Sequence, residues 1–438
     1  MDSRGLIITV IGGGSSYTPE LLDGLIARRE TLPLAELRLV DVEEGRRKVE
    51  IIADLARRMF THAGLSPVVT ATLDRRQALA GADFVISQFR AGGLAARKRD
   101  EHIPLQFGII GQETTGPGGM MNALRTIPIA LDIARDMKEL CPGARLLNFT
   151  NPSGIVTEAL ARYGGVPVTG LCNVPISLIR ALAAGLGVDA SRLNCSFAGL
   201  NHLSVMYDAK LDGQSIMPQL LASDLLAKAI MENIPDVGWG VDFLQSLGAI
   251  PSPYLRYFYF PEVMRREEEE AVKNGPGSRA EVVQRVEEEL FAIYADAGTY
   301  KKPEQLSQRG GAWYSEVALM TMEAMATNRP SVQVLNVPNQ GAIPDLPRDA
   351  VVEVNCVVDA QGVTPLAAPP LPLAVRGLVQ QVKAYEQLTV EAAVAQDRRL
   401  AFLALLNHPL VPGAAVAREL LTALLDANRD DLPWEWFS

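Results

Sequence analysis

The sequence predicts an α/β protein, in which a Rossmann-like, doubly wound parallel sheet over about residues 1–172 precedes a mixed α+β domain over 173–438. The first domain is predicted by short apolar runs that alternate with segments of helical period. These runs lack polar alternation, as expected of strands that are buried on both faces. A change of pattern after residue 172, to strand-like runs that look antiparallel, predicts the second domain.

The N-terminal elements follow one another in a regular order. The run GLIITVI (5–11) predicts the first strand, and TPELLDGLIAR (18–28) has helical periodicity. The segment 43–63 is amphipathic and predicts a longer helix. Further strands, with helix-like segments between them, are predicted at 37–41, 67–72, 82–88, 144–150 and 166–171.

The second domain mixes strands and helices without a repeated unit. The stretch RLNCSFAGLNHLSVMYDAKLDG (192–213) predicts two strands around GLNH, and residues 332–362 supply further strand-like runs. Helices are predicted at 217–232, 280–296, 312–327, 370–391 and 412–427.

Composition narrows the class of partner. The 438 residues are 48% hydrophobic, which predicts a sizeable core, and carry a net charge of −10. An acidic surface favours neither nucleic acid nor an anionic membrane as a partner. There is no run of about 18 apolar residues and no signal-peptide pattern, so a cytoplasmic protein is expected. The four cysteines lie far apart, which favours free thiols over disulfides.

The glycine loop VIGGGSSYTPELL (10–22) lies between a predicted strand and a predicted helix. Glycines there permit a tight turn and a close approach of the backbone to a pyrophosphate at the helix N-terminus. Asp41 ends the second strand, where a carboxylate can accept hydrogen bonds from ribose hydroxyls, and this favours NAD over NADP. Tyr17 replaces the third glycine of the dinucleotide pattern, and a simple tight turn is the alternative. The predicted NAD-binding residues are Gly12, Gly13, Gly14, Ser15, Ser16 and Asp41.

Cys172 and His202 form a candidate metal pair. Cys172 follows the strand VPVTGL, and ligands of open parallel sheets lie beyond the carboxyl ends of the strands. His202 lies between the two strand-like runs of the second domain. A thiolate and an imidazole suit a divalent transition metal, but two ligands are too few for a structural zinc site. Taken alone, Cys172 also suits a buried small hydrophobe and His202 a loop residue with satisfied hydrogen bonds.

Six stretches resemble the NAD- and metal-dependent glycoside hydrolases of family four, and they occur in the family's order over most of the chain. Within that family the sequence is most similar to the 6-phospho-β-glucosidases, through GLCNVP and GQETTGPGG. The six stretches are GGGSSYTPELL (12–22), GIIGQETTGPGG (108–119), LNFTNPSGIV (147–156), GLCNVP (170–175), GLNHL (199–203) and PSPYLRYFYF (251–260).

The resemblance implies roles for particular residues. Cys172 and His202 would hold a divalent metal, usually Mn²⁺, and Tyr254 would be the catalytic base, made more basic by Glu113. Family members that cleave α-linked sugars carry an aspartate after the metal-binding cysteine, and Asn173 replaces it here, which favours a β-linked substrate. The implied substrate-binding residues are Arg97, Asn151 and Arg279.

The implied reaction is hydrolysis of 6-phospho-β-glucosides with no net redox change. NAD⁺ would take hydride from C3 of the sugar, the C2 proton would leave, the C1 group would be eliminated, water would add, and NADH would return the hydride. The family also implies a homodimer or homotetramer with a small sugar-phosphate substrate. Two other functions stay open: a hydroxy-acid dehydrogenase of the malate or lactate type, and a non-catalytic regulator that binds NAD or a sugar phosphate.

Overall fold

One continuous mixed sheet organises the computed structural model, which describes residues 5–223, 225, 238–309 and 313–437. Six parallel strands have the order β3-β2-β1-β4-β5-β6, the doubly wound arrangement that binds nucleotides at its switch point. This order confirms the predicted Rossmann-like class. The strands are β1 (Leu6–Ile11), β2 (Leu34–Val40), β3 (Val68–Thr72), β4 (Phe84–Ser87), β5 (Arg145–Asn148) and β6 (Val168–Gly170).

The central strands form where the apolar runs predicted them, because both of their faces are buried. In β1, the successive residues Ile8, Thr9 and Val10 point to alternate faces, and none of them has exposed surface. The helices of this half are α1 (Thr18–Ala27), α2 (Arg46–His62), α3 (Arg75–Leu79), α4 (Gly93–Gln106), α5 (Gly116–Leu140), α6 (Ser153–Ala159) and α7 (Val174–Leu186).

The second half of the chain extends the same sheet with antiparallel strands. β11 pairs with β6 through Asn336 and Gly170, and the order continues as β12, β7, β8 and β10. The predicted pair around GLNH is confirmed as β7 and β8. The added strands are β7 (Leu193–Leu200), β8 (Leu203–Leu211), β9 (Gln214–Ser215), β10 (Ile250–Pro251), β11 (Ser331–Pro338), β12 (Val351–Asp359) and β13 (Gly362–Pro365).

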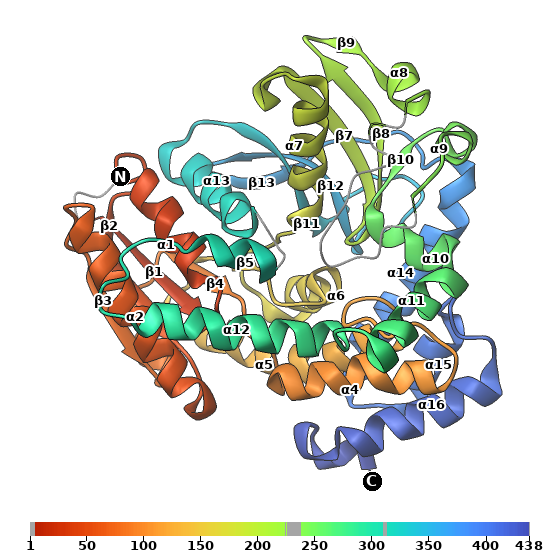
Figure 1. The fold of residues 1–438 in the computed structure, drawn as a ribbon, viewed down its shortest axis with the longest axis horizontal. Helices are drawn as coiled ribbons and strands as arrows, with labels where there is room; N and C mark the ends of the chain where they lie inside the picture. Colours follow the sequence, from red (N-terminus) through yellow and green to blue (C-terminus); the bar gives the residue numbers. More distant parts are fainter. Residues whose placement is uncertain (1–4, 224, 226–237, 310–312, 438) are drawn as a thin grey trace.

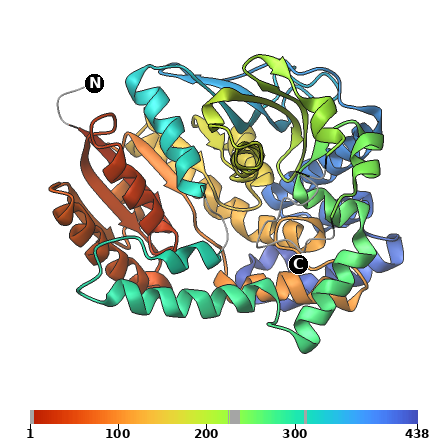
Figure 2. The same cartoon turned by 45° about the horizontal axis from the view of Figure 1, so that its top comes forward.

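Helices of the second half pack on those of the first (Figures 1 and 2). α12 lies against α2 and α4, α14 against α5 and α6, and α16 against α4. The helix predicted at 217–232 is present as the short α8, and residues 224 and 226–232 of that prediction lie outside the described residues. The helices are α8 (Met217–Leu221), α9 (Val241–Leu247), α10 (Arg256–Tyr259), α11 (Pro261–Asn274), α12 (Arg279–Ala295), α13 (Tyr314–Thr327), α14 (Leu373–Ala395), α15 (Arg398–Asn407) and α16 (Ala414–Ala427).

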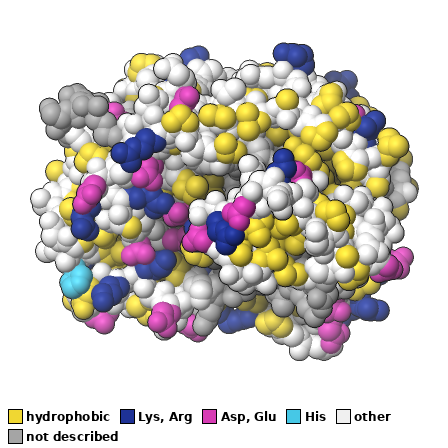
Figure 3. Space-filling view, turned by 90° about the horizontal axis from the view of Figure 1, so that it is seen from above, with side chains coloured by type: hydrophobic (Ala, Val, Ile, Leu, Met, Phe, Trp, Pro, Cys, Tyr) yellow, Lys and Arg dark blue, Asp and Glu magenta, His cyan; other side chains and the backbone are white. Residues whose placement is uncertain are grey.

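The molecular surface carries both charged and hydrophobic side chains. On the face shown in Figure 3, basic and acidic side chains are interspersed, while hydrophobic side chains gather over the centre and right. Among the described helices, none combines the length and the apolar character that a membrane span needs.

Candidate active site

A cavity of about 1270 Å³ opens at the carboxyl ends of the parallel strands. Its wall is built from both halves of the chain, because the glycine loop, the turn after β6, the β7–β8 turn and the start of α12 all reach it. Of the predicted site residues, all but Gly13 and Ser16 line it: Gly12, Gly14, Ser15, Asp41, Arg97, Glu113, Asn151, Cys172, Asn173, His202, Tyr254 and Arg279.

The glycine loop is shaped as a nucleotide cradle. Gly12 has a φ of +80°, and a Cβ there would lie 2.8 Å from the backbone of Phe89. The Gly14 backbone N–H donates to Asp41 Oδ2 at 2.9 Å, and a Cβ on Gly14 would meet the same oxygen at 2.6 Å. Larger residues would therefore close the cradle, and the loop fits the pyrophosphate and ribose of a dinucleotide.

Gly13 and Ser16 have supporting positions behind this lining. A Cβ on Gly13 would lie 2.7 Å from Leu39 Cβ, so the loop packs directly on β2. The buried Ser16 hydroxyl donates to Glu287 Oε1 of α12 at 3.0 Å. Gly13 therefore holds the loop against β2, and Ser16 holds it against α12.

The sheet brings Cys172 and His202 together through one row of residues across four strands. Gly170 of β6 pairs with Asn336 of β11, Asn336 with Glu353 of β12, and Glu353 with Gly199 of β7. Cys172 follows the first member of this row and His202 follows the last. The cysteine and histidine therefore reach one cavity, although they lie 30 residues apart in sequence (202 − 172).

The carboxylate of Glu353 lies beside the Cys172 thiol. Its buried carboxylate accepts hydrogen bonds from Ser204 Oγ at 2.6 Å and from Asn201 Nδ2 at 3.2 Å. Burial, together with the Glu353 carboxylate, raises the pKa of Cys172 well above its usual value, so a cation would be needed to hold the thiolate.

His202 lies in the β7–β8 turn with a φ of +63°. Two residues, Tyr254 and Thr114, contact its ring. The ring of Tyr254, from the 3₁₀ turn Pro253–Leu255, stacks on it with centroids 3.6 Å apart and an interplanar angle of 10°. Thr114 Oγ1 lies 3.0 Å from His202 Nδ1. Burial lowers the pKa of His202 to about 3, so the imidazole is neutral at pH 7 and suited to bind a metal.

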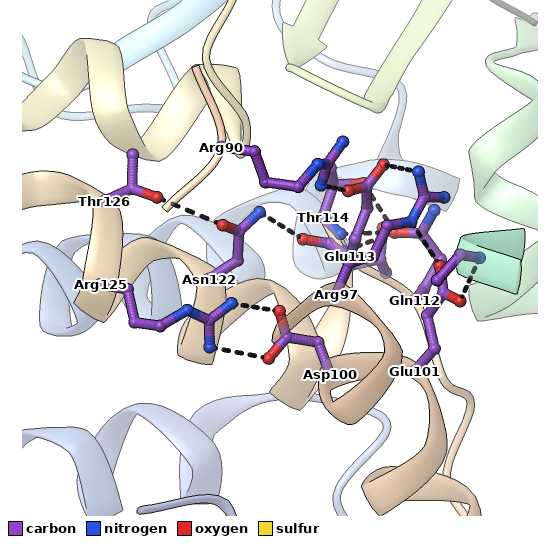
Figure 4. Close-up of polar contacts among 12 residues, drawn as sticks. Arg90, Arg97, Asp100, Glu101, Gln112, Glu113, Thr114, Asn122, Arg125 and Thr126 are labelled. Atoms are coloured by element: carbon purple, nitrogen blue, oxygen red, sulfur yellow. Dashed lines mark hydrogen bonds and ion pairs between the residues drawn. The ribbon is translucent and has the colours of Figure 1, made fainter. Parts of the chain in front are cut away.

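Glu113 lies in a cage of cations in the loop between α4 and α5 (Figure 4). Its carboxylate pairs with Arg90 and, at 3.1 Å, with Arg97 Nη1. Burial would raise the pKa of Glu113, but these two guanidinium groups outweigh it and hold the pKa at about 2. Arg97 is buried, whereas its basic neighbour Lys98 is exposed.

The remaining predicted residues lie around this centre. Asn173 precedes α7 directly after Cys172, and Asn151 follows β5. Arg279 is the first residue of α12 and donates through Nη2 to the backbone carbonyl of Arg309. All three side chains belong to the cavity wall.

Several charged residues of the site were missed by sequence analysis. Arg90 follows β4, and its place beyond the carboxyl end of a strand was the signal that could have found it. Glu353 is a lone carboxylate in the apolar run VVEVNCVV, which was also a usable signal. Arg309 and Glu287 lie far apart from the glycine loop in sequence, and only their contacts show that they support it.

Comparison with known proteins gives the family. The model for family 4 glycosyl hydrolases matches residues 7–188, and the model for the C-terminal domain of that family matches residues 197–411. The chain is 48% identical to a probable 6-phospho-β-glucosidase of Bacillus subtilis, over 98% of each chain. It is 40% identical to the 6-phospho-β-glucosidase of Escherichia coli, over 98% of this chain and 97% of the relative.

A solved structure agrees with this match along nearly the whole chain. The 6-phospho-β-glucosidase of Thermotoga maritima with NAD and glucose-6-phosphate superposes with a TM-score of 0.89 at 35% identity, covering 98% of this chain and 99% of that one. Another structure of that enzyme holds manganese, NAD⁺ and glucose-6-phosphate and has a TM-score of 0.88. The two family models and the full-length relatives together place this chain in family 4 of the glycosyl hydrolases.

Proposed function

We propose that this protein hydrolyses 6-phospho-β-glucosides and that it needs NAD⁺ and a divalent metal, which by analogy with its relatives is Mn²⁺. The observation that carries the proposal is the stack of Tyr254 on His202 in the same cavity as Cys172 and the glycine loop. A phenol, an imidazole and a thiol beside a dinucleotide cradle suit oxidation, proton abstraction and elimination better than direct displacement.

The residues of the cavity fit both NAD⁺ and a divalent metal. The cradle around Gly12 and Gly14 would hold the dinucleotide, and the soft donors Cys172 and His202 would hold the metal. When bound, NAD⁺ supplies reversible acceptance of a hydride from C3 and the divalent ion supplies Lewis-acid stabilisation of negative charge on the sugar oxygens.

Tyr254 is positioned to take the C2 proton. Its ring is buried and held against His202, so its hydroxyl has a defined place in the cavity. A phenol ordinarily titrates near pH ~10, and nearby cations favour its phenolate form. Arg97 is one such cation, because its guanidinium interacts electrostatically with Tyr254. Glu113 holds Arg97 in place, and in this way it supports the base.

Asn173 supports a β-linked substrate. It lines the cavity directly after Cys172, where the family resemblance implies an aspartate acid in members that cleave α-linked sugars, and an amide cannot donate a proton as an acid. Water would then protonate the leaving group. Arg97, Asn151 and Arg279 would bind the sugar and its phosphate, because guanidinium groups match phosphate oxygens in geometry and charge.

The two parts of the chain would divide this work. We assign NAD binding to residues 1–172, which carry the glycine loop, and metal, substrate and oligomer contacts to residues 173–438, which carry His202, Tyr254 and Arg279. A cytoplasmic location fits a phosphorylated substrate. A homodimer or homotetramer is supported by the hydrophobic side chains gathered on one face (Figure 3).

The decisive experiment is hydrolysis of a panel of aryl glycosides, α and β, gluco and galacto, with and without a 6-phosphate. Each assay contains NAD⁺ and Mn²⁺, and turnover of the 6-phospho-β-glucoside above all others is the expected result. NADH that accumulates in proportion to turnover would indicate a dehydrogenase instead. Absence of cleavage across the panel, with NAD⁺ still bound, would indicate a regulator.

A further inference from the structure

The loop that carries Glu113 also contains an amide whose orientation is determined by its neighbours (Figure 4). Gln112 Oε1 accepts hydrogen bonds from the backbone N–H of Thr114 at 2.6 Å and from that of Thr115 at 3.0 Å. Two backbone donors can only meet an oxygen, so the carbonyl end of the Gln112 amide points at them. The Gln112 side chain is buried, which protects this arrangement from competing water.

The same oxygen determines where the Thr114 hydroxyl proton lies. Thr114 Oγ1 is 2.7 Å from Gln112 Oε1, and because that oxygen can only accept, the hydroxyl must donate to it. A hydroxyl has one proton, so Thr114 Oγ1 can only accept from His202 Nδ1, which lies 3.0 Å away. His202 Nδ1 therefore carries the proton of the neutral ring.

We propose that Gln112 and Thr114 are positioning residues that select the Nδ1–H tautomer of His202 and leave Nε2 with the lone pair that binds the metal. The inference rests on the metal site of the proposed function. In the opposite tautomer, the metal-binding nitrogen would carry a proton, and Thr114 would face Nδ1 with its own proton already committed to Gln112. The stack of Tyr254 holds the plane of the ring, and Thr114 holds its rotation and tautomer.

Loss of the Thr114 hydroxyl should lower the affinity for the metal while the protein still folds. Loss of the hydrogen bond to the second nitrogen of a metal-binding histidine typically lowers metal affinity about 10- to 100-fold. Thr114→Val has nearly the same shape but removes the hydroxyl, whereas Thr114→Ser retains it. Thr321→Val is the matched control, because the buried Thr321 Oγ1 also lies 2.8 Å from a glutamine Oε1, that of Gln333, and 2.8 Å from the Val317 carbonyl oxygen, but it belongs to α13.

The first measurement needs no variant in the loop. Nitrogen-15 NMR of metal-free protein with labelled histidine reports which ring nitrogen carries the proton, and His202→Asn identifies the His202 signals among the four histidines. The expected result is a protonated Nδ1 and an unprotonated Nε2. The reverse tautomer in the wild-type protein would overturn the inference.

The second measurement is the Mn²⁺ dissociation constant, from the electron paramagnetic resonance signal of free Mn²⁺. Thr114→Val should bind about 10- to 100-fold more weakly, while Thr114→Ser and Thr321→Val bind like the wild type. If Thr114→Val folds and binds Mn²⁺ like the wild type, the role assigned to Thr114 is wrong, but the metal site of the proposed function is unaffected. Wild-type protein that does not bind Mn²⁺ overturns the metal site of the proposed function, and the role assigned to Thr114 with it.

Discussion

Glu287→Gln should destabilise the protein through charge alone, because Glu287 is the shared acceptor behind the glycine loop. This buried carboxylate of α12 accepts from Ser16 Oγ at 3.0 Å, from Lys48 Nζ at 3.0 Å and from Arg309 Nη2 at 3.0 Å. Glutamine has nearly the same shape and can still accept from Ser16. It cannot offset the two cations.

The magnitude follows from the pKa of Glu287. Burial would raise this pKa, but Arg309 and Lys48 outweigh burial and lower it from the ordinary 4.5 to about 2. A difference of about 2.5 pKa units corresponds to about 3 kcal/mol in the free energy of unfolding at pH 7. Because the folded pKa is the lower one, this stabilisation is complete above pH ~4.5 and is lost as the pH falls toward ~2. It should be about 2 kcal/mol at pH 3.5.

Urea unfolding followed by tryptophan fluorescence measures this difference at both pH values. The wild type should be more stable than Glu287→Gln by about 3 kcal/mol at pH 7, and the gap should narrow at pH 3.5. Glu43→Gln is the control, because Glu43 pairs with Arg46 on the exposed surface and its loss should change stability far less. NAD⁺ affinity, measured by calorimetry, should be retained in Glu287→Gln, since the acceptor for Ser16 remains.

The reasoning is refuted if Glu287→Gln is as stable as the wild type at pH 7, since the carboxylate would then have no net effect. It is also refuted if the two proteins differ by the same amount at both pH values, because a loss that does not depend on pH reflects packing and not charge.

Three further predictions concern the proposed chemistry. Tyr254→Phe should keep NAD⁺ binding but lower turnover by about 10²–10⁴, and wild-type product formed in D₂O should carry deuterium at C2, as mass spectrometry would detect. Normal turnover by Tyr254→Phe would remove this residue as the base. Cys172→Ser and His202→Ala should lose metal-dependent activity and retain NAD⁺ affinity by calorimetry, whereas full wild-type activity after exhaustive chelation would contradict the metal site. NAD⁺ should activate the enzyme more than NADP⁺ in parallel assays, because Asp41 would repel the 2′-phosphate, and equal activation at equal concentration would count against this role.

Some features of this protein could be predicted from sequence because their cause is local. The buried strands of the first half are continuous apolar runs such as LIITVI of β1, and the loop after it needs glycine wherever the backbone passes close to Phe89 or Asp41. Asp41 lies at the cavity, as expected of a residue that directly follows a strand beside that loop, because strand ends in a parallel sheet meet at one edge.

Other features depend on long-range contacts that carry no local pattern. Arg97 lies in a run of three basic residues, yet it is buried, and its guanidinium pairs with Glu113 of the loop after α4. Arg90 completes the cage around Glu113 from a different loop. Ion pairs between distant segments leave no periodicity in the sequence, so spacing alone could not place them.

The sequence by itself therefore determined the doubly wound half, the nucleotide loop and, through family resemblance, the set of candidate residues. Only the tertiary structure decided that β11 joins β6, which carries the row Gly170, Asn336, Glu353 and Gly199 across the sheet and brings Cys172 and His202 to one cavity. The physical reason is that strand pairing depends on burial and backbone hydrogen bonds along whole strands, and these act between segments far apart in sequence.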